Sequence, residues 1–388
     1  MVDTRYSEML KFSLLFTLFC IIIVLALMLL NSMIKNAKTS AGIGIVVMTI
    51  LSAIRCNFGS DYFNYFTQYN SIKLYFQSPE EILKVNIQSG FPLLAYTVKS
   101  FFENQFAIFV VIAIMASIII FKIIMDNSEM PILSFSIWIF GGFFLMSTNI
   151  LKQYIAMVFI FLAFQYFKKK KISRFAIFSV LAIMFHVTAL PVMVTIFFVN
   201  RIRLSFSFLI FGSIISLFLG FFSGKLFNVI TRIPLFNKYM ERYLTETGID
   251  FSDIKLILNT VLVSLALFGV SLFIIMVSKK VTFDSDIIFY TKLIIISVFI
   301  SLVSINFFYF GRISYYYAQF LILLLPNAIT KMENKQLQKK YLRMIYGFLA
   351  IFCFCFTILS GENNYYNYST IFTDTPISVK EFVIYGGN

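Results

Sequence analysis

The sequence has few charged residues, few cysteines and a single histidine, and each shortage excludes a class of protein. Charged side chains make up 13% of the 388 residues, whereas an ordinary soluble protein has about a quarter. The four cysteines lie within or at the edge of apolar runs, which argues against a disulfide framework and for packing residues. With one histidine and no paired acids on a loop expected to face outward, no metal site and no cofactor are predicted.

Apolar residues are what the chain has in excess. They make up 60% of the sequence, including 50 phenylalanines, and runs long enough to cross about 30 Å of hydrocarbon recur along the whole length. The pattern predicts an all-α polytopic integral membrane protein with roughly 10–12 transmembrane or half-membrane helices. We see no repeat of fixed period and no soluble segment, so residues 1–388 are expected to form a single membrane domain.

Basic residues give this predicted membrane protein an orientation. The net charge of +14 does not indicate a nucleic-acid partner, because the cations cluster in loops between spans, where they set topology and face the lipid bilayer. Five positive charges fall within the seven residues Lys168–Arg174, which predicts a cytoplasmic loop. We therefore expect a multi-pass protein of the cytoplasmic (inner) membrane, with loops 57–89 and 223–253 and the tail 361–388 on the outer side.

Two segments need a more detailed interpretation. Pro131–Met146 and Ile150–Phe167 are predicted to form a helical hairpin with its turn at Ser147–Asn149. Phe175–Val199 is too short for two full crossings, yet basic residues at both of its ends favour the same side. We expect two short helices that meet near His186; the alternative is one crossing, which would put the last basic loop on the wrong side.

This topology brings polar groups together on the predicted outer face, among them Arg55, Asp61, Lys152, His186 and Arg312. Cations neutralise phosphate charge, and tyrosine rings stack on sugar faces while their hydroxyls form hydrogen bonds. The set is therefore suited to a sugar attached to a diphosphate. Tyr-rich segments and two further arginines are expected on the same face: Arg232, Arg242, Tyr239 and Tyr243.

Each of these residues also has a structural interpretation. Asp61 follows Gly-Ser and is equally suited to cap a helix. His186 lies in an apolar run, where a histidine is often held by local hydrogen bonds. Lys152 is placed to extend toward the headgroups, and Arg312 to anchor an aromatic cluster at the interface. Tyr239 and Tyr243 share one side of a helix that would lie on the membrane surface.

Four short motifs occur in order along the chain. They are Arg55…Gly59-Ser60-Asp61-Tyr62-x-Asn64-Tyr65, Leu151-Lys152-Gln153-x-x-Ala156, Phe185-His186-Val187-Thr188-Ala189 and Gly311-Arg312-Ile313-x-x-Tyr316. Their order resembles the EpsG-type family of bacterial exopolysaccharide polymerases, which are related in role to the Wzy polymerases. The resemblance covers roughly residues 40 to 370 and includes one departure, Lys152 where arginine is usual. An ammonium cannot grip a phosphate with two parallel hydrogen bonds as a guanidinium can.

The resemblance implies an outward-facing glycosyltransferase that joins oligosaccharide repeat units carried on undecaprenyl diphosphate, with flippase and chain-length regulator proteins as further partners. Diphosphate is already a good leaving group, so a metal is not required if fixed cations stabilise its charge. Asp61 or His186 would be the general base, and Lys152 and Arg312 the catalytic cations. The substrate-binding residues would be Arg55, Tyr62, Asn64, Tyr65, Gln153, Arg232, Tyr239, Tyr243 and Tyr316.

Three other functions stay open. A lipid-linked oligosaccharide flippase would place its cations at mid-membrane depth and would not need a long outer loop. A membrane polysaccharide O-acyltransferase would also use a buried lone histidine. An assembly partner without catalysis would tolerate substitutions at these residues. Neither the sugars and their linkage nor the choice between capsule, O-antigen and exopolysaccharide follows from the sequence.

Overall fold

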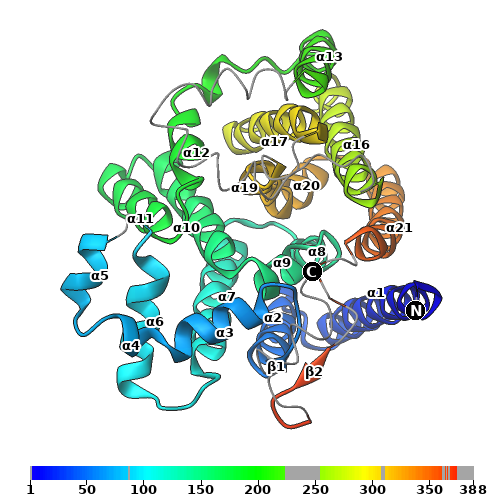
Figure 1. Ribbon diagram of the computed structural model, residues 1–388. Coiled ribbons are helices and arrows are strands. Elements are labelled where there is room, and N and C mark those ends of the chain that lie inside the picture. Colours follow the sequence, from blue (N-terminus) through cyan, green and yellow to red (C-terminus); the bar gives the residue numbers. More distant parts are fainter. Residues whose placement is uncertain are drawn as a thin grey trace. The chain divides into compact units, whose positions relative to one another are not determined.

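The computed structural model describes residues 2–85, 88–222, 254–306, 311–360, 363, 365 and 368–373. Within them the chain is overwhelmingly helical (Figure 1), and the prediction of an all-α polytopic membrane protein is confirmed. Five described helices are long and apolar enough to cross a membrane. They are α1 (Val2–Ile34), α7 (Ala107–Asn127), α16 (Ile254–Val277), α17 (Ser285–Val303) and α21 (Lys335–Leu359).

The chain divides into two compact units, residues 1–193 with 344–388 and residues 194–343. In the first unit α2 (Ala37–Ala53) packs closely against α1, α7 and α8 (Pro131–Phe140). A Cβ atom built on Gly44 would lie 2.6 Å from Leu27 and 2.8 Å from Phe135. Close approach through small residues is the usual way in which membrane helices gain van der Waals contact, because lipid offers no hydrophobic driving force between them.

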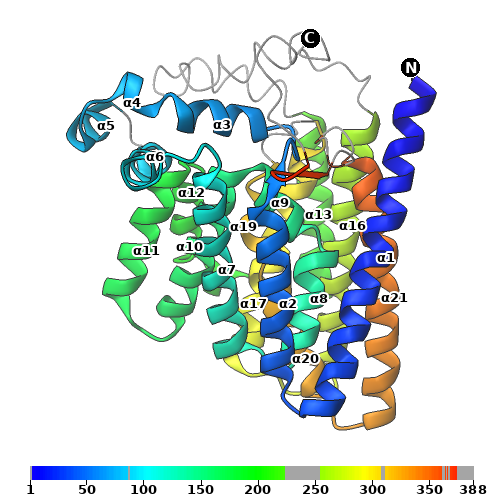
Figure 2. The ribbon, with the colours of Figure 1, turned by 90° about the horizontal axis from the view of Figure 1, so that it is seen from below.

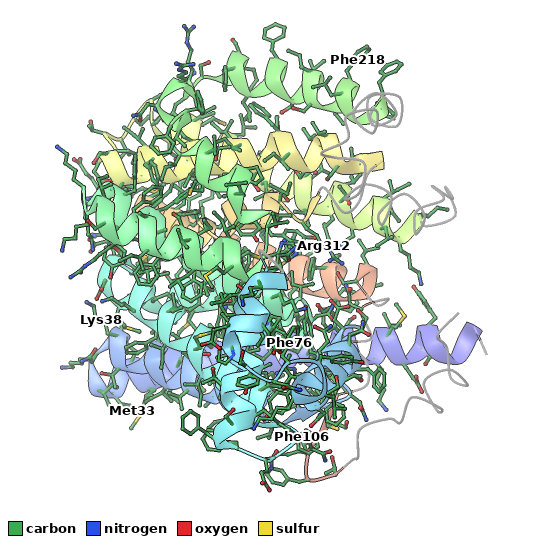
Figure 3. All side chains as sticks on the ribbon, turned by 60° about the vertical axis from the view of Figure 1, so that its left-hand side comes forward. Met33, Lys38, Phe76, Phe106, Phe218 and Arg312 are labelled. Atoms are coloured by element: carbon green, nitrogen blue, oxygen red, sulfur yellow. The ribbon has the colours of Figure 1, made fainter. Side chains whose placement is uncertain are left out.

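The two ends of the first unit differ in charge and structure. The turn between α1 and α2 carries Lys35 and Lys38 (Figure 3), and the turn between α10 (Leu151–Lys168) and α11 (Ile172–Phe185) carries Lys168–Lys171. We call this the basic end. At the opposite end short helices lie across the tips of the long ones (Figure 2). They are α3 (Tyr62–Asn70), α4 (Ile72–Tyr75), α5 (Pro79–Val85) and α6 (Gly90–Phe101).

The predicted hairpin before the basic turn is wrong in its first arm. Helix α8 ends at Phe140, and α9 (Phe143–Asn149) follows at an angle of 53°, so that residues 147–149 are helical rather than a turn. Gly142 lies between them with φ +79°, a conformation that glycine adopts readily, and an added Cβ would lie 2.5 Å from Phe356. The break therefore occurs at Gly141-Gly142, where backbone geometry and close packing both require glycine.

The second ambiguous segment is two helices, as predicted. Helix α11 ends at Phe185, residues 186–188 interrupt it, and α12 (Ala189–Thr195) continues. With 14 residues, α11 extends about 21 Å, less than the roughly 30 Å of a hydrocarbon core. His186 thus occupies a helix break.

The second unit contains α13 (Phe206–Phe221), α16, α17, α19 (Ser314–Ala318) and α20 (Leu321–Thr330). The apolar run Ile313–Pro326 does not form one continuous α-helix. Instead the amides of Phe320, Ile322 and Leu323 each donate to the carbonyl three residues back, so the chain tightens between α19 and α20. Helix α20 then continues four residues past Pro326.

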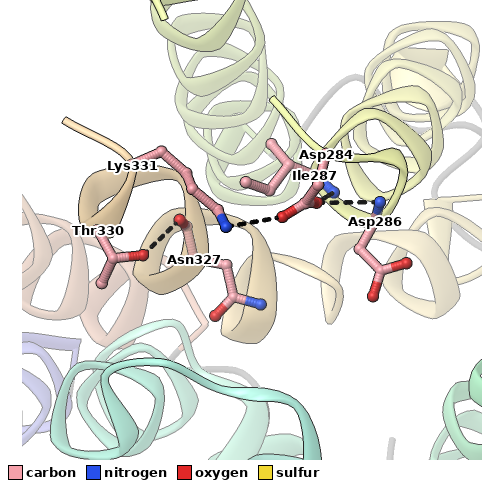
Figure 4. A network of polar contacts seen from close by, with 6 residues as sticks. All are labelled: Asp284, Asp286, Ile287, Asn327, Thr330 and Lys331. Carbon is pink, nitrogen blue, oxygen red and sulfur yellow. Dashed lines mark hydrogen bonds and ion pairs between the residues drawn. The ribbon is translucent and has the colours of Figure 1, made fainter. Parts of the chain in front are cut away.

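In the second unit an ion pair joins the start of α17 to the end of α20 (Figure 4). Asp284 caps α17 by accepting from the amides of Asp286 and Ile287, and Lys331 Nζ lies 3.1 Å from its carboxylate. Burial raises the pKa of Asp284, but these amides and Lys331 outweigh it and lower the pKa overall. The start of α17 and the end of α20 therefore lie at the same end, as the predicted basic loops require.

Candidate functional site

Asn149 connects three segments that are far apart in sequence. Its Oδ1 accepts from the Asp61 amide at 2.9 Å and from the Ser60 hydroxyl at 3.3 Å. Its Nδ2 donates to Asn363 Oδ1 at 3.2 Å, and the Asn363 carbonyl accepts from the Ser60 amide at 2.8 Å. The Asn149 side chain is 2% exposed, so these bonds are made where an unpaired amide would be costly.

The turn that Asn149 holds contains Asp61. Gly59 has φ +95°, and a Cβ there would lie 3.0 Å from Asn149 Oδ1; only glycine allows the turn to wrap so closely. Asp61 stands at the start of α3, but its side chain makes no capping hydrogen bond. The half-buried carboxylate therefore does not cap the helix, and its catalytic role stays a prediction.

Lys152 begins α10 beside the same turn. Its Nζ donates to Gln68 Oε1 at 2.7 Å and lies 4.8 Å from the ring centre of Phe91 and 5.7 Å from that of Tyr65. Asp61 acts on it as the opposite charge. The ammonium is therefore held over two aromatic rings by cation–π attraction and one hydrogen bond, instead of extending into the headgroups.

Of the other residues predicted in this region, Asn64 is exposed, whereas Tyr62, Tyr65 and Gln153 are buried. The Tyr62 ring stacks on Phe109 at 4.4 Å, and the Tyr65 ring packs against Phe91 at 5.3 Å. The tyrosines therefore form the packed support of the site, with Asn64 beside it on the accessible side of α3.

Arg55 lies directly beneath the turn. It is 1% exposed, its Nη1 donates to the Ser52 carbonyl and hydroxyl, and its guanidinium lies 5.0 Å from the ring centre of Phe109. Burial lowers the pKa of Arg55 to about 10, so the group keeps its charge at neutral pH. Arg55, which was predicted to bind substrate, is thus buried in this structure.

The C-terminal segment covers Arg55. Strand β1 (Arg55–Cys56) pairs antiparallel with β2 (Ser369–Thr370). The Tyr368 hydroxyl donates to the Leu51 carbonyl at 2.9 Å, and the Ile371 amide donates to the Ile54 carbonyl at 2.9 Å. We call residues 368–373 the strap; it lies at the end of the first unit where Asp61 lies.

His186 belongs to the same unit and follows α11. Its Nδ1 is 2.6 Å from the Thr188 hydroxyl, a local bond of the kind that fixes a ring's orientation. Gly90, next to Phe91, packs so tightly on the end of α11 that an added Cβ would lie 2.7 Å from Phe185. Lys152 packs against Phe91, and Gly90, the residue before Phe91, contacts the end of α11. His186 directly follows that end of the helix.

The remaining predicted residues lie elsewhere. Arg312 is in the second unit, at the end of α17 away from Asp284, where Gly311 packs against Ser304. Tyr316, four residues further along the chain, is fully buried. Arg232, Tyr239 and Tyr243 lie outside the described residues. In the described chain no group of three His, Cys, Asp or Glu side chains is arranged to hold a metal ion.

Comparison with known proteins adds a family to this geometry. The model of the EpsG family matches residues 38–370. The chain belongs to the EpsG family. Comparison with curated proteins and with solved structures returned no match. Because the family is associated with polysaccharide biosynthesis, this EpsG-family chain is an exopolysaccharide-related membrane protein.

Sequence reasoning missed two residues that build the site of this EpsG-family protein. Gln68 holds Lys152 from the second turn of α3, with only its position on that short helix as a signal. Asn149 was placed in a turn, although a polar residue at the end of an apolar run and three positions before Lys152 was a visible signal. Both act through contacts between distant segments, which the sequence pattern does not show.

Proposed function

We propose that this protein is a polymerase that joins oligosaccharide repeat units carried on undecaprenyl diphosphate. The bond between the anomeric carbon of the growing glycan and its diphosphate breaks, and a sugar hydroxyl of a second lipid-linked unit forms the new glycosidic bond. The hydroxyl proton must pass to a base, and the departing diphosphate must have its negative charge stabilised.

The observation that carries this proposal is the grouping of Asp61, Lys152 and aromatic rings at one end of the first unit. Asp61 is a carboxylate that caps no helix and is within electrostatic reach of a lysine. Lys152 supplies a fixed positive charge over Phe91 and Tyr65. A base and a cation in one place, the cation fixed by buried aromatic rings, are what transfer of a sugar from a diphosphate needs.

In this proposal Asp61 takes the proton from the acceptor hydroxyl and Lys152 faces the diphosphate. His186 is the second candidate base, since its Nδ1 is engaged by Thr188 and the ring nitrogen that would accept a proton is then Nε2. The positive-inside rule puts the basic end in the cytoplasm and hence this group on the outer side of the cytoplasmic membrane.

The test is an Asp61→Asn variant in a strain whose own gene for this protein is deleted. Asparagine keeps the size and much of the hydrogen bonding but takes no proton, so the rate should fall on the order of 10²–10⁴-fold. The polymer ladder should collapse to single repeat units on their carrier, at unchanged protein level in the membrane. Asp286→Asn, in the cap of α17 at the basic residues, is the matched control and should leave the ladder intact.

A full-length ladder from Asp61→Asn would indicate that His186 is the general base. A full-length ladder from His186→Gln as well would exclude both residues as the general base. Accumulation of intact lipid-linked units on the inner leaflet, instead of the outer one, would indicate a flippase. Loss of acyl groups with normal polymer length would indicate an O-acyltransferase.

A further inference from the structure

Arg55 is a buried cation whose hydrogen bonding is incomplete. Only Nη1 is bonded, to Ser52; in the described structure Nε and Nη2 are buried without a hydrogen-bond partner. The titratable groups that act on the guanidinium are Tyr62 and Tyr368, and no carboxylate among the described residues acts on it. A buried charge without a counter-charge is costly, and folded proteins normally pair it.

The two unused nitrogens have a definite geometry. Nε and Nη2 form one edge of the planar guanidinium, the edge that donates two parallel hydrogen bonds to two oxygens of one anion. Its flat face is already against Phe109 at 5.0 Å, and Ser52 holds the other nitrogen. The side chain is thus fixed in position with its bidentate edge unused, an arrangement that fits an oxyanion such as a phosphate or diphosphate group.

The strap closes this position. Tyr368 packs edge-on against Phe58 at 5.1 Å, the Ser369 hydroxyl donates to the Cys56 carbonyl at 2.8 Å, and Thr370 stands opposite Arg55 in the ladder. The ladder that joins the strap to β1 is only two residues long. Release of the strap breaks the hydrogen bonds of Tyr368, Ser369 and Ile371 to the segment 51–56 and exposes the backbone at Arg55.

We propose that Arg55 is a binding site for a phosphate-class anion and that the strap opens to admit this anion and closes over it. Resting on the proposed function, the natural ligand is the diphosphate of the lipid-linked substrate. The strap then forms part of the substrate site, and the diphosphate contacts Arg55 as well as Lys152.

The strand register supplies a direct test, because Ser369 is the partner of the native Cys56. Paired residues in antiparallel strands have Cα atoms about 4.5–5.5 Å apart, within the range of a disulfide. A Ser369→Cys variant should therefore lock the strap shut on oxidation. Purified protein in detergent is titrated with farnesyl diphosphate, inorganic pyrophosphate and, as the uncharged control, farnesol.

Reduced Ser369→Cys protein should bind farnesyl diphosphate as wild type does, and the oxidised form at least tenfold more weakly, with recovery after a reductant is added. The Cys56→Ser, Ser369→Cys double variant should not respond to oxidation. Equal binding by the locked and unlocked forms would overturn the strap's role. Tighter binding of farnesyl diphosphate than pyrophosphate would identify a lipid headgroup as the source; equal binding would identify free diphosphate.

Arg55→Met tests the site itself. It keeps the length and the packing on Phe109 but removes the charge, so binding of the diphosphate should fall at least tenfold with no decrease in melting temperature. Arg55→Lys should retain weaker binding. A lower melting temperature for both variants would show a structural role instead. The same conclusion would follow if Arg55→Met no longer weakened diphosphate binding in a chain whose Glu362 and Asp374, the acids that flank the strap in sequence, are changed to Gln and Asn.

The outcomes separate this inference from the proposed function. If the protein is not a polymerase, Asp61→Asn leaves the polymer unchanged, yet binding of the diphosphate still depends on Arg55 and the lock. If only the Arg55 site is wrong, polymerisation continues in the oxidised Ser369→Cys protein while Asp61→Asn still stops it.

Discussion

Asn149→Ala should impair catalysis by releasing the turn that carries Asp61. The substitution removes the acceptor for the Asp61 amide and the Ser60 hydroxyl and the donor to Asn363. At about 1 kcal/mol net for each bond, the three sum to about 3 kcal/mol. Every 1.4 kcal/mol is tenfold, so the ratio of ordered to released turn falls by about 100-fold.

The assay is polymerisation by purified protein in lipid vesicles, with the rate measured at several concentrations of lipid-linked repeat unit. A misplaced Asp61 should lower kcat more than it raises KM, because the carboxylate acts on the proton in the transition state. Ser147→Ala is the matched control: Ser147 is a buried neighbour on α9 whose hydroxyl donates only within its own helix, to Phe144.

One further variant sharpens the result. Asn149→Asp keeps an acceptor for the Asp61 amide but loses the donor to Asn363, and it should retain more activity at low pH than at high pH if its added charge disturbs Asp61. Wild-type kcat in Asn149→Ala, or an equal loss in Ser147→Ala, would refute the view that Asn149 positions the catalytic turn.

Three other predictions follow from the charge arrangement. In intact cells a single cysteine at position 170 should be shielded from an impermeant thiol reagent, and one at position 364 should react with it. Labelling of position 170 would show that the orientation is the reverse of the one predicted. Lys152→Arg should keep activity while Lys152→Met loses most of it, because a cation over Phe91 and Tyr65 is required; equal rates would remove Lys152 from the mechanism. Arg312→Ala should cost more polymer than Arg312→Lys at equal protein level, and identical complete losses would indicate a bidentate contact or a folding role.

The membrane class and the long apolar helices followed from the sequence, because they depend on local composition. Long apolar runs with few charges can satisfy their backbone only as helices in lipid, and clusters such as Lys168–Lys171 predict which ends face the cytoplasm. The break at His186 was also predicted, since basic residues at both ends of a short apolar run exclude a simple crossing. The break at Gly141-Gly142 was missed although the paired glycines are a local signal.

The arrangement of the site was decided by tertiary structure. Arg55 resembles an accessible phosphate contact in the sequence, but a strand 313 residues away covers it. Asp61 resembles a helix cap, but Asn149, 88 residues away, accepts from its amide and leaves the carboxylate to other partners. Helical periodicity and charge patterns report on neighbours three or four residues apart. Contacts between β1 and the strap, or between Lys152 and Gln68, arise only when distant segments pack together, so only the folded chain shows which polar groups are enclosed and which face a substrate.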